Sequence, residues 1–374
     1  MSSRSMHAVS LFSGAGGMDI GFKRAGYDIA WANDLDPVAC ETFTSNDLGD
    51  IACGSINDHL HDLKKFEGID LVFGGPPCQG FSVAGKMDPT DKRSALVWSY
   101  VKVIEQLRPS AFVMENVKAL ATLSRWSAFR FELIQTLGAL GYSMHLEVLK
   151  ATDFNVPQKR ERMFLVGVRK GSAHAFKTVI KKHQRKAQTV RKALSHLDIA
   201  GTGNNQRICN AEITLASNPI MRKSPYAGMI FNGAGRPIEV DGYALTLPAS
   251  MGGNKTPIID DVVLADTNAK NWVVEYHAHL MKGGEPYPWK DVPAHLRRIT
   301  VDEALALQTF PHDFKLAGKK SDAYRMIGNA VPCNLAYAVA STMIELLKNP
   351  HAAEQKNMHS YQEDRQSDFL FEVA

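Results

Sequence analysis

Short apolar runs alternate with helical patterns over about the first 170 residues, and this alternation constrains the fold more than any other feature of the sequence. Apolar runs of about four to eight residues between turn residues are typical of buried strands. Strands separated by helices form βαβ units around a largely parallel sheet, which helices cover on both faces. We therefore expect an α/β fold whose ligands bind at the carboxyl ends of the strands. The expected strands are 8–12, 29–32, 71–73, 111–114 and 163–168, and the expected helices are 18–25, one from residue 37, 96–107 and 125–137.

The pattern changes near Arg169. From there to Leu197 the sequence holds nine Lys or Arg residues and no Asp or Glu, which predicts either a solvated helical face or a stretch that contacts phosphates. Residues 200–296 are rich in Gly, Asn, Pro and Thr, so we expect a separate, loop-rich domain there. Helical patterning then returns. The predicted organisation is a first domain at 1–171, a second domain at 172–296, a return to the first domain at 297–348 and a polar tail at 349–374.

Cysteine content and the lack of long apolar runs exclude several classes of protein. The five cysteines are scattered without a CxxC pair, so neither a disulfide framework nor a metal site is expected. No run approaches the roughly 18–20 apolar residues of a membrane span, and the first residues carry no secretion signal. These features predict a cytoplasmic protein with no membrane association and no bound metal. The net charge of +4 is too small to indicate nucleic-acid binding by itself.

A glycine-rich turn, LFSGAGG at 11–17, follows the first expected strand and opens the first expected helix. Glycines let the backbone approach a ligand, and a helix N-terminus offers unpaired N–H groups. Asp34 ends the second strand, where a carboxylate can accept both hydroxyls of a ribose; the alternative is a cap for the helix from Pro37. Asp19 stands where the dinucleotide fingerprint GxGxxG needs a small residue. A ligand with a ribose but no phosphate therefore fits better, and S-adenosylmethionine is the commonest such cofactor.

A cysteine follows the third expected strand, within the sequence GGPPCQGFS at 74–82. A cysteine on a loop at the ligand-binding edge of a sheet is placed to act as a nucleophile, although isolated cysteines are more often small buried apolar residues. The two prolines before Cys78 stiffen the loop, and packing alone does not easily explain the segment. Cys78 is therefore the candidate nucleophile.

Charged residues flank two later strands. Glu115 ends an apolar strand, where burial should oppose ionisation, so its carboxyl group can hold or share a proton. A helix cap or an ion pair is the alternative for Glu115. Gln158, Arg160 and Arg162 alternate before another strand, which predicts that they share one face. Arginines there can bind a carboxylate, a base edge or a phosphate, and can favour a nearby thiolate.

In order and spacing, these segments resemble the motifs of the DNA (cytosine-5)-methyltransferases. LFSGAGG is similar to the first cofactor motif of that family, PPCQGFS to its catalytic loop, ENV at 115–117 to its glutamate motif, and QKRERMFLVGVR at 158–169 to its arginine motif. Residues 298–311 and GNAVP at 328–332 resemble the closing motifs. Thr246-Leu247 with Gly252-Gly253 resembles a short signature in the target-recognition region. The similarity covers about residues 8 to 345.

The resemblance implies a Rossmann-like domain that binds S-adenosylmethionine, together with a smaller, loop-rich, mainly β target-recognition domain. It implies methyl transfer to carbon 5 of a cytosine flipped out of double-stranded DNA, with the thiolate of Cys78 bound transiently to carbon 6. Glu115 would contact the base at N3 and at its exocyclic amine, and Arg162 would orient the ring. Arg160 and Gln158 would support the loop and the glutamate.

The resemblance also assigns binding residues. The implied cofactor residues are Phe12, Gly14, Gly17, Asp34, Ile56, Pro77, Leu96, Asn329 and Val331. The implied DNA contacts are Gln79, Ser82, Arg93, Thr246 and Leu247. Further candidates, for which an ordinary surface role is an equal alternative, are Tyr226, Tyr243, Lys255, His277, His279 and Lys282. Three positions depart from the family pattern: Ser10 and Ser55 stand where aspartates are usual, and Leu35 stands where an aromatic residue is frequent.

Three alternatives remain open from the sequence: an RNA cytosine-5 methyltransferase of the same fold, a dinucleotide-dependent oxidoreductase, and a DNA-binding regulator without activity. The long segment before residue 297 favours duplex DNA, because sequence readout needs a module that reaches a groove. The expected partners are double-stranded DNA and a restriction endonuclease acting on the same site. We expect the protein itself to be a monomer.

Overall fold

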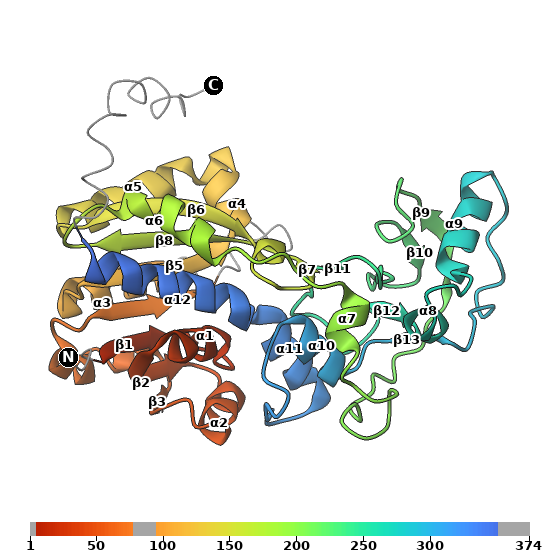
Figure 1. Cartoon of the computed structure of the whole chain (residues 1–374), viewed down its shortest axis with the longest axis horizontal. Helices are drawn as coiled ribbons and strands as arrows, with labels where there is room; N and C mark the ends of the chain where they lie inside the picture. The colour runs from red at the N-terminus through yellow and green to blue at the C-terminus, as the bar shows by residue number, and fades with distance from the viewer. Residues whose placement is uncertain (1–4, 78–94, 351–374) are drawn as a thin grey trace.

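A seven-stranded sheet forms the core of the larger part of the molecule, at one end of the view in Figure 1. The computed structural model of the chain describes residues 5–77 and 95–350. Its strands run in the order β3-β2-β1-β4-β5-β8-β6. All neighbouring strands are parallel except at β8, which is antiparallel to both β5 and β6. The strands are β1 (Met6–Leu11), β2 (Tyr27–Asp34), β3 (Ile51–Cys53), β4 (Leu71–Gly74), β5 (Ala111–Val117), β6 (Ser143–Lys150) and β8 (Glu161–Val168).

The five strands expected from apolar runs are confirmed, and two further strands were missed. β3 is only three residues long, and β6 alternates polar and apolar residues of intermediate exposure, so neither contains a continuous apolar run. β5 also extends farther than expected, to Val117. Glu115 and Asn116 therefore lie within a buried strand rather than after it.

Helices cover both faces of the sheet, and each face has its own hydrophobic core. One core is formed with α1 (Gly17–Ala25) and α12 (Cys333–Lys348), and the other with α3 (Ala95–Leu107) and α5 (Ser127–Ala139). α1 and α12 are in close contact, because a Cβ on Gly21 would lie 2.5 Å from the Cβ of Ala336. The C-terminal helices thus return to the sheet, as Figure 1 shows for α12. The remaining helices near the sheet are α2 (Pro37–Ser45), α4 (Lys118–Thr122), α10 (Val301–Leu307) and α11 (Lys320–Asn329).

Within the described residues, one stretch, Lys320–Lys348, is long and apolar enough to cross a membrane by composition alone. It comprises α11 and α12, and 61% of its most apolar window is buried. Its apolar side chains, among them Leu335 and Val339, belong to the same core as α1. We therefore interpret it as core helix.

Short elements and long loops make up the region between β8 and α10. It contains α6 (Phe176–Val179), α7 (Val190–Leu194), β9 (Leu215–Ile220), β10 (Met229–Phe231), β11 (Ala244–Leu245), β12 (Ile258–Asp260), α8 (Asp261–Ala265), α9 (Trp272–Met281) and β13 (Leu296–Arg298). β9 pairs with β10, β12 with β13, and β11 with β7 (Gln158–Lys159). The loop-rich character agrees with expectation, but the mainly β character does not, because α9 is the longest element here. Short β-like runs fold as isolated pairs when no wide sheet is available to extend them.

This region has a small core of its own, far from the sheet. Leu215, Phe231 and Tyr276 belong to it, and Figure 1 places β9, β10 and α9 at the end of the molecule opposite the large sheet. By contrast, Phe176 and Ile180 lie beyond the predicted boundary at 171 but pack in the core of α12. The residue ranges proposed for the two domains remain a prediction.

Basic residues of the stretch 169–197 are partly paired within the chain. Lys182 lies 2.7 Å from the carboxylate of Glu345 on α12, and Arg191 lies 2.7 Å from that of Asp241. The side chains of Lys182 and Arg191 therefore bind carboxylates of the same chain, which holds this stretch against neighbouring segments.

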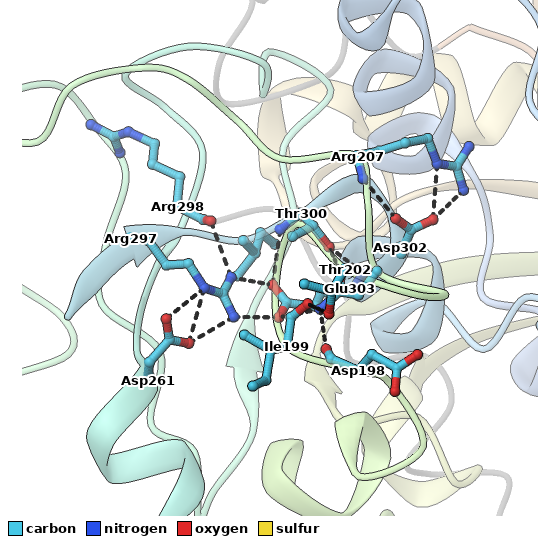
Figure 2. Close-up of polar contacts among 12 residues, drawn as sticks. Asp198, Ile199, Thr202, Arg207, Asp261, Arg297, Arg298, Thr300, Asp302 and Glu303 are labelled. Carbon is cyan, nitrogen blue, oxygen red and sulfur yellow. Dashed lines mark hydrogen bonds and ion pairs between the residues drawn. The ribbon is translucent and has the colours of Figure 1, made fainter.

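A group of ion pairs and hydrogen bonds, here called the polar joint, connects the region between β8 and α10 (the small region) to α10 itself (Figure 2). Arg297 of β13 lies 2.8 Å from Asp261 of α8 and 2.6 Å from Glu303 of α10. Glu303 is buried and also completes a capping box with Thr300. Removing one member of a buried ion pair typically costs roughly 3–5 kcal/mol, because the other charge is left unpaired. The joint therefore fixes the orientation of α8 and β13 relative to α10.

Candidate active site

The turn after β1 has a backbone conformation that favours glycine. Gly14 and Gly16 have positive φ angles of 55° and 83°. A Cβ on Gly16 would lie 2.2 Å from Leu48 Cδ1, and a Cβ on Gly17 would lie 2.6 Å from the carbonyl oxygen of Val331. A side chain is therefore disfavoured at Gly14 by conformation, at Gly17 by space, and at Gly16 by both. The contact also brings together two predicted cofactor residues, Gly17 and Val331, that lie more than 300 positions apart.

Asp34 holds this turn from the end of β2. One carboxylate oxygen accepts the N–H of Gly14 at 2.7 Å, and the other accepts the N–H of Asp36 at 2.8 Å. The alternative that Asp34 caps the next helix is wrong, because Asp36 is the N-cap of α2 and accepts the N–H of Val38. Burial raises the pKa of Asp34, while the two backbone N–H groups act against that rise. The structure thus places Asp34 directly beside the glycine turn.

Other predicted cofactor residues surround the same edge of the sheet. Phe12 and Ile56 pack in one core, and Leu96 lies in the first turn of α3. Asn329 ends α11, and Pro77 closes the described part of the loop after β4. Ser55, where the family usually has an aspartate, caps a short 3-10 turn by accepting the N–H of Asn57.

Asp19 is a buried acid that sequence reasoning considered only as a departure from a fingerprint. It lies in the first turn of α1 with no exposed surface, and neither carboxylate oxygen has a hydrogen-bond partner among the described residues. Burial raises the pKa of Asp19 to about 7, although the nearby Ser10 hydroxyl acts against the rise. The Ser10 hydroxyl in turn lies 2.8 Å from that of Ser13 in the glycine turn. A buried carboxyl group therefore lies near Ser10, next to the turn.

This burial should make the stability of the free protein depend on pH. An unfolded chain ionises Asp19 near its ordinary pKa of 3.8, whereas the folded chain does so only near 7, so stability is lost as pH rises between these values. Asp19→Asn removes this loss. We expect the variant to gain about 2–3 kcal/mol in the free energy of unfolding, relative to the parent, between pH 5 and pH 8. Denaturant titrations at the two pH values measure it.

Asp50→Asn is a matched control for that experiment, because Asp50 is an exposed acid directly before β3. The difference in the free energy of unfolding between this control variant and the parent should be nearly independent of pH above pH 5. An equal pH response in the parent and in Asp19→Asn would show that Asp19 ionises normally in the folded protein.

Glu115 and Arg162 form a buried ion pair between β5 and β8. Arg162 Nε lies 2.9 Å from Glu115 Oε1, and the side chains are only 15% and 12% exposed. Burial raises the pKa of Glu115, and the positive charges of Arg162 and Arg160 act against that rise. The ion pair was an open alternative for Glu115, and the structure contains it. A carboxyl group in this environment can accept a proton from a bound base or share one with it.

The loop after β4 packs directly against this pair. A Cβ on Gly75 would lie 2.9 Å from Glu115 Oε2, so glycine leaves room for the carboxylate. Asn116 donates its side-chain N–H to the carbonyl oxygen of Pro76 at 3.1 Å. Residues 74–77 therefore approach Glu115 immediately before Cys78. Cys78 itself lies outside the described residues, as do the predicted DNA contacts Gln79, Ser82 and Arg93.

Gln158 and Arg160 form hydrogen bonds to other segments of the chain. Arg160 donates to the carbonyl oxygens of Leu247 and Gly328, at 3.3 and 3.0 Å. Gln158 accepts the N–H of Leu247 and donates to Gln308. Gln308, fully buried at the C-terminal end of α10, lies within the segment 298–311 that resembles a closing motif, but the sequence analysis assigned it no role in the site.

The remaining predicted DNA contacts lie in the small region or at its junction with the sheet. Thr246 donates its hydroxyl to the carbonyl oxygen of Lys159, and the Leu247 side chain is buried. Their contact with DNA stays a prediction, although a buried Leu247 side chain positions its segment rather than forming a surface. His277 is also buried, with its ring nitrogen 2.8 Å from the carbonyl oxygen of Arg222. In the described part of the chain, no group of three or more His, Cys, Asp or Glu residues could hold a metal ion.

Comparison with known proteins identifies the family. The family model of C-5 cytosine-specific DNA methylases matches residues 6–345. The Type II methyltransferase M1.HphI of Haemophilus parahaemolyticus is 32% identical over 366 residues, covering 92% of this chain and 88% of that protein. M.FnuDI of Fusobacterium nucleatum, also a Type II methyltransferase, is 32% identical over 352 residues, covering 91% of this chain and 95% of that protein.

Solved structures agree with the fold. The methyltransferase EhMeth of Entamoeba histolytica has a TM-score of 0.67 at 17% identity, covering 92% of this chain and 99% of that one. A DNA modification methyltransferase encoded within an E. coli prophage has a TM-score of 0.62 at 21% identity, covering 92% of this chain and 100% of that one. The family and the fold imply S-adenosylmethionine as the methyl donor. The chain therefore belongs to the C-5 cytosine-specific DNA methylase family and is a DNA (cytosine-5-)-methyltransferase of the restriction-modification type.

Proposed function

We propose that the protein methylates a cytosine flipped out of a specific double-stranded DNA sequence, through a transient covalent bond between Cys78 and carbon 6 of the base. The observation that carries this proposal is the buried Glu115–Arg162 pair, which lies against the residues that lead into Cys78. Flipping is needed because carbon 6 is inaccessible within stacked DNA.

Glu115 and Arg162 have distinct roles in this proposal. The Cys78 thiolate adds to carbon 6, which makes carbon 5 nucleophilic, and negative charge develops on the pyrimidine. Glu115 stabilises that charge by sharing a proton with N3 and by accepting from the exocyclic amine. Arg162, held 2.9 Å from Glu115, fixes the carboxylate and orients the ring. After transfer, carbon 5 loses its proton and the thiolate is eliminated, which restores the free enzyme.

Residues at the glycine turn fit the cofactor. Asp34 offers carboxylate oxygens for ribose hydroxyls, and the turn of Gly14 to Gly17 leaves no side chain in the way. When bound, S-adenosylmethionine supplies an electrophilic methyl group. Phe12, Ile56, Leu96 and Val331 would enclose its adenosine in apolar surface.

The proposal includes the biological setting expected from the sequence. We propose a monomer that acts on DNA in the cytoplasm and protects it from a restriction endonuclease with the same target. The names of the related Type II methyltransferases support this setting. The region between β8 and α10, joined to the sheet through Arg297 and Glu303, would read the sequence.

Trapping with 5-fluorocytosine tests the covalent step. A duplex carrying 5-fluorocytosine at the target should become bound to the protein, because fluorine cannot leave as the proton does, and the complex should survive denaturation. Bisulfite sequencing of DNA from a host that expresses the gene first identifies the target. Cys78→Ser should bind S-adenosylhomocysteine like the parent but give neither trapping nor methylation.

The same assay separates the alternatives. Methylation of tRNA but not of DNA would favour the RNA enzyme. Normal DNA methylation by Cys78→Ser would refute the covalent mechanism.

A further inference from the structure

Two parallel bridges connect Leu247 of the small region to the segment 327–330 at the end of α11. In one bridge, Arg160 donates to the carbonyl oxygen of Leu247 at 3.3 Å and to that of Gly328 at 3.0 Å. In the other, the N–H of Leu247 donates to Gln158 at 3.1 Å, and Gln158 donates to Gln308 at 3.1 Å. Both backbone polar groups of Leu247 are thereby engaged. We call this set of contacts the amide clamp.

Gln308 connects the second bridge to the segment 327–330, which leads into the predicted cofactor residue Val331. Its side-chain N–H groups donate to the carbonyl oxygens of Ile327 at 2.6 Å and Ala330 at 3.3 Å. Carbonyl oxygens only accept, so the Gln308 nitrogen must face them, and its oxygen must receive the N–H of Gln158. The same reasoning turns the Gln158 oxygen toward the N–H of Leu247. The clamp therefore has only one consistent arrangement of donors and acceptors.

Burial makes this arrangement stringent. Gln158, Leu247 and Gln308 have no exposed surface, and Arg160 is 1% exposed. The two segments also touch directly, because a Cβ on Gly328 would lie 2.5 Å from the carbonyl oxygen of Pro248. An unpaired buried amide costs about 1–3 kcal/mol, so one segment cannot move without a matching movement of the other.

The clamp lies between a predicted DNA contact and the predicted cofactor site. On one side, Leu247 follows Thr246, a predicted DNA contact. On the other side, the segment 327–330 leads into Val331, whose carbonyl oxygen packs against Gly17 of the glycine turn. The same clamp therefore positions both the segment of Thr246 and Leu247 and the segment that leads into Val331.

We propose that Gln308 is a positioning residue through which cofactor occupancy and DNA binding strengthen one another. This inference rests on the proposed function of the two sites. Coupling between binding sites is reciprocal, so the cofactor product should raise DNA affinity by the same factor by which DNA raises affinity for the product. Coupling of this kind is typically about 5–150-fold.

Substitutions at Gln308 and Gln158 can remove chosen hydrogen bonds of the clamp, either with or without adding a charge. Gln308→Glu keeps the oxygen that accepts from Gln158 but loses the donors to Ile327 and Ala330. Gln158→Glu keeps the acceptor for Leu247 but loses the donor to Gln308. Gln308→Met removes all polar contacts while keeping the volume and placing no charge in the core. Gln106→Glu is the matched control, because Gln106 of α3 donates one similar bond to the carbonyl oxygen of Leu60, away from the clamp.

The experiment measures DNA affinity by fluorescence anisotropy with and without saturating S-adenosylhomocysteine, on a labelled duplex that carries the target mapped by bisulfite sequencing. In the parent and in Gln106→Glu, the product should tighten DNA binding at least about fivefold. In Gln308→Glu and Gln308→Met, the factor should fall at least about twofold below that of the parent, because only the Arg160 bridge then remains, while each ligand still binds alone. The double variant Gln158→Glu/Gln308→Glu should lose no more coupling than either single variant, because both break one path.

Undiminished coupling in a folded Gln308→Met variant would overturn the inference, as would a parent in which the product leaves DNA affinity unchanged. Gln158→Glu provides the same test if the Gln308 variants do not fold. Failure of the parent to bind S-adenosylhomocysteine at all is a different result, because it would refute the proposed cofactor site itself and the coupling with it.

Discussion

Glu115→Gln is expected to lower kcat for DNA methylation by about 10²–10⁴-fold, with much smaller changes in cofactor affinity. The glutamine keeps the shape of the side chain, but it carries no charge to balance Arg162 and cannot share a proton with the base. Arg162 Nε would then face an amide across a distance that is now 2.9 Å. Initial rates with labelled S-adenosylmethionine measure the loss, and titration with S-adenosylhomocysteine tests whether the cofactor site remains intact.

A matched control for this variant is Glu161→Gln. Glu161 precedes Arg162 in β8, but it pairs with Lys118 on the surface, where such pairs contribute about 0–1 kcal/mol. The methylation rate of Glu161→Gln should stay within about threefold of the rate of the parent. A near-normal rate for Glu115→Gln would exclude the role assigned to that carboxylate, whatever the control shows.

The pH dependence of the rate provides a second view of Glu115. Burial raises the pKa of this carboxyl group, and the two arginines act against that rise. Because the carboxyl group must carry the proton that it shares with N3, activity should fall as pH is raised through this raised pKa. That alkaline limb should be absent from the residual activity of Glu115→Gln.

Asp34→Ala should weaken binding of S-adenosylhomocysteine by about 10²-fold or more. A hydrogen bond to a charged group is typically worth about 1.5–3 kcal/mol, and the proposal assigns Asp34 two such bonds to the ribose. The substitution also removes the acceptor of the Gly14 and Asp36 N–H groups, so the turn itself loses its fixed shape. Calorimetric titration measures the affinity, and the melting temperature shows whether the fold survives.

Asp28→Ala serves as the control for Asp34→Ala. Asp28 lies on the same strand, is exposed, and pairs with His7 at the opposite end of β2. Affinity for S-adenosylhomocysteine should be unchanged in this variant. Equal affinity in folded Asp34→Ala and the parent would mean that the ribose binds elsewhere.

Local patterns were sufficient to predict much of the sheet. β4 and β5 contain continuous runs of fully buried apolar residues, and in β1 the buried stretch from Ala8 to Leu11 is apolar except at Ser10. The glycines at 14 and 16 needed no tertiary information either, because their positive φ angles are a property of the turn itself. Asp34 was placed correctly beside that turn since parallel neighbouring strands end at the same edge of the sheet.

The sequence by itself therefore determined the strands with apolar runs, the glycine turn and the order of the catalytic motifs, because these depend on residues close together in the chain. Only the tertiary structure decided that Asp36 caps α2, that Glu115 pairs with Arg162, and that Gln158 meets Gln308. Each of these outcomes depends on which donor lies nearest to a buried polar group. That choice is made when distant segments pack, and no local period or spacing encodes it.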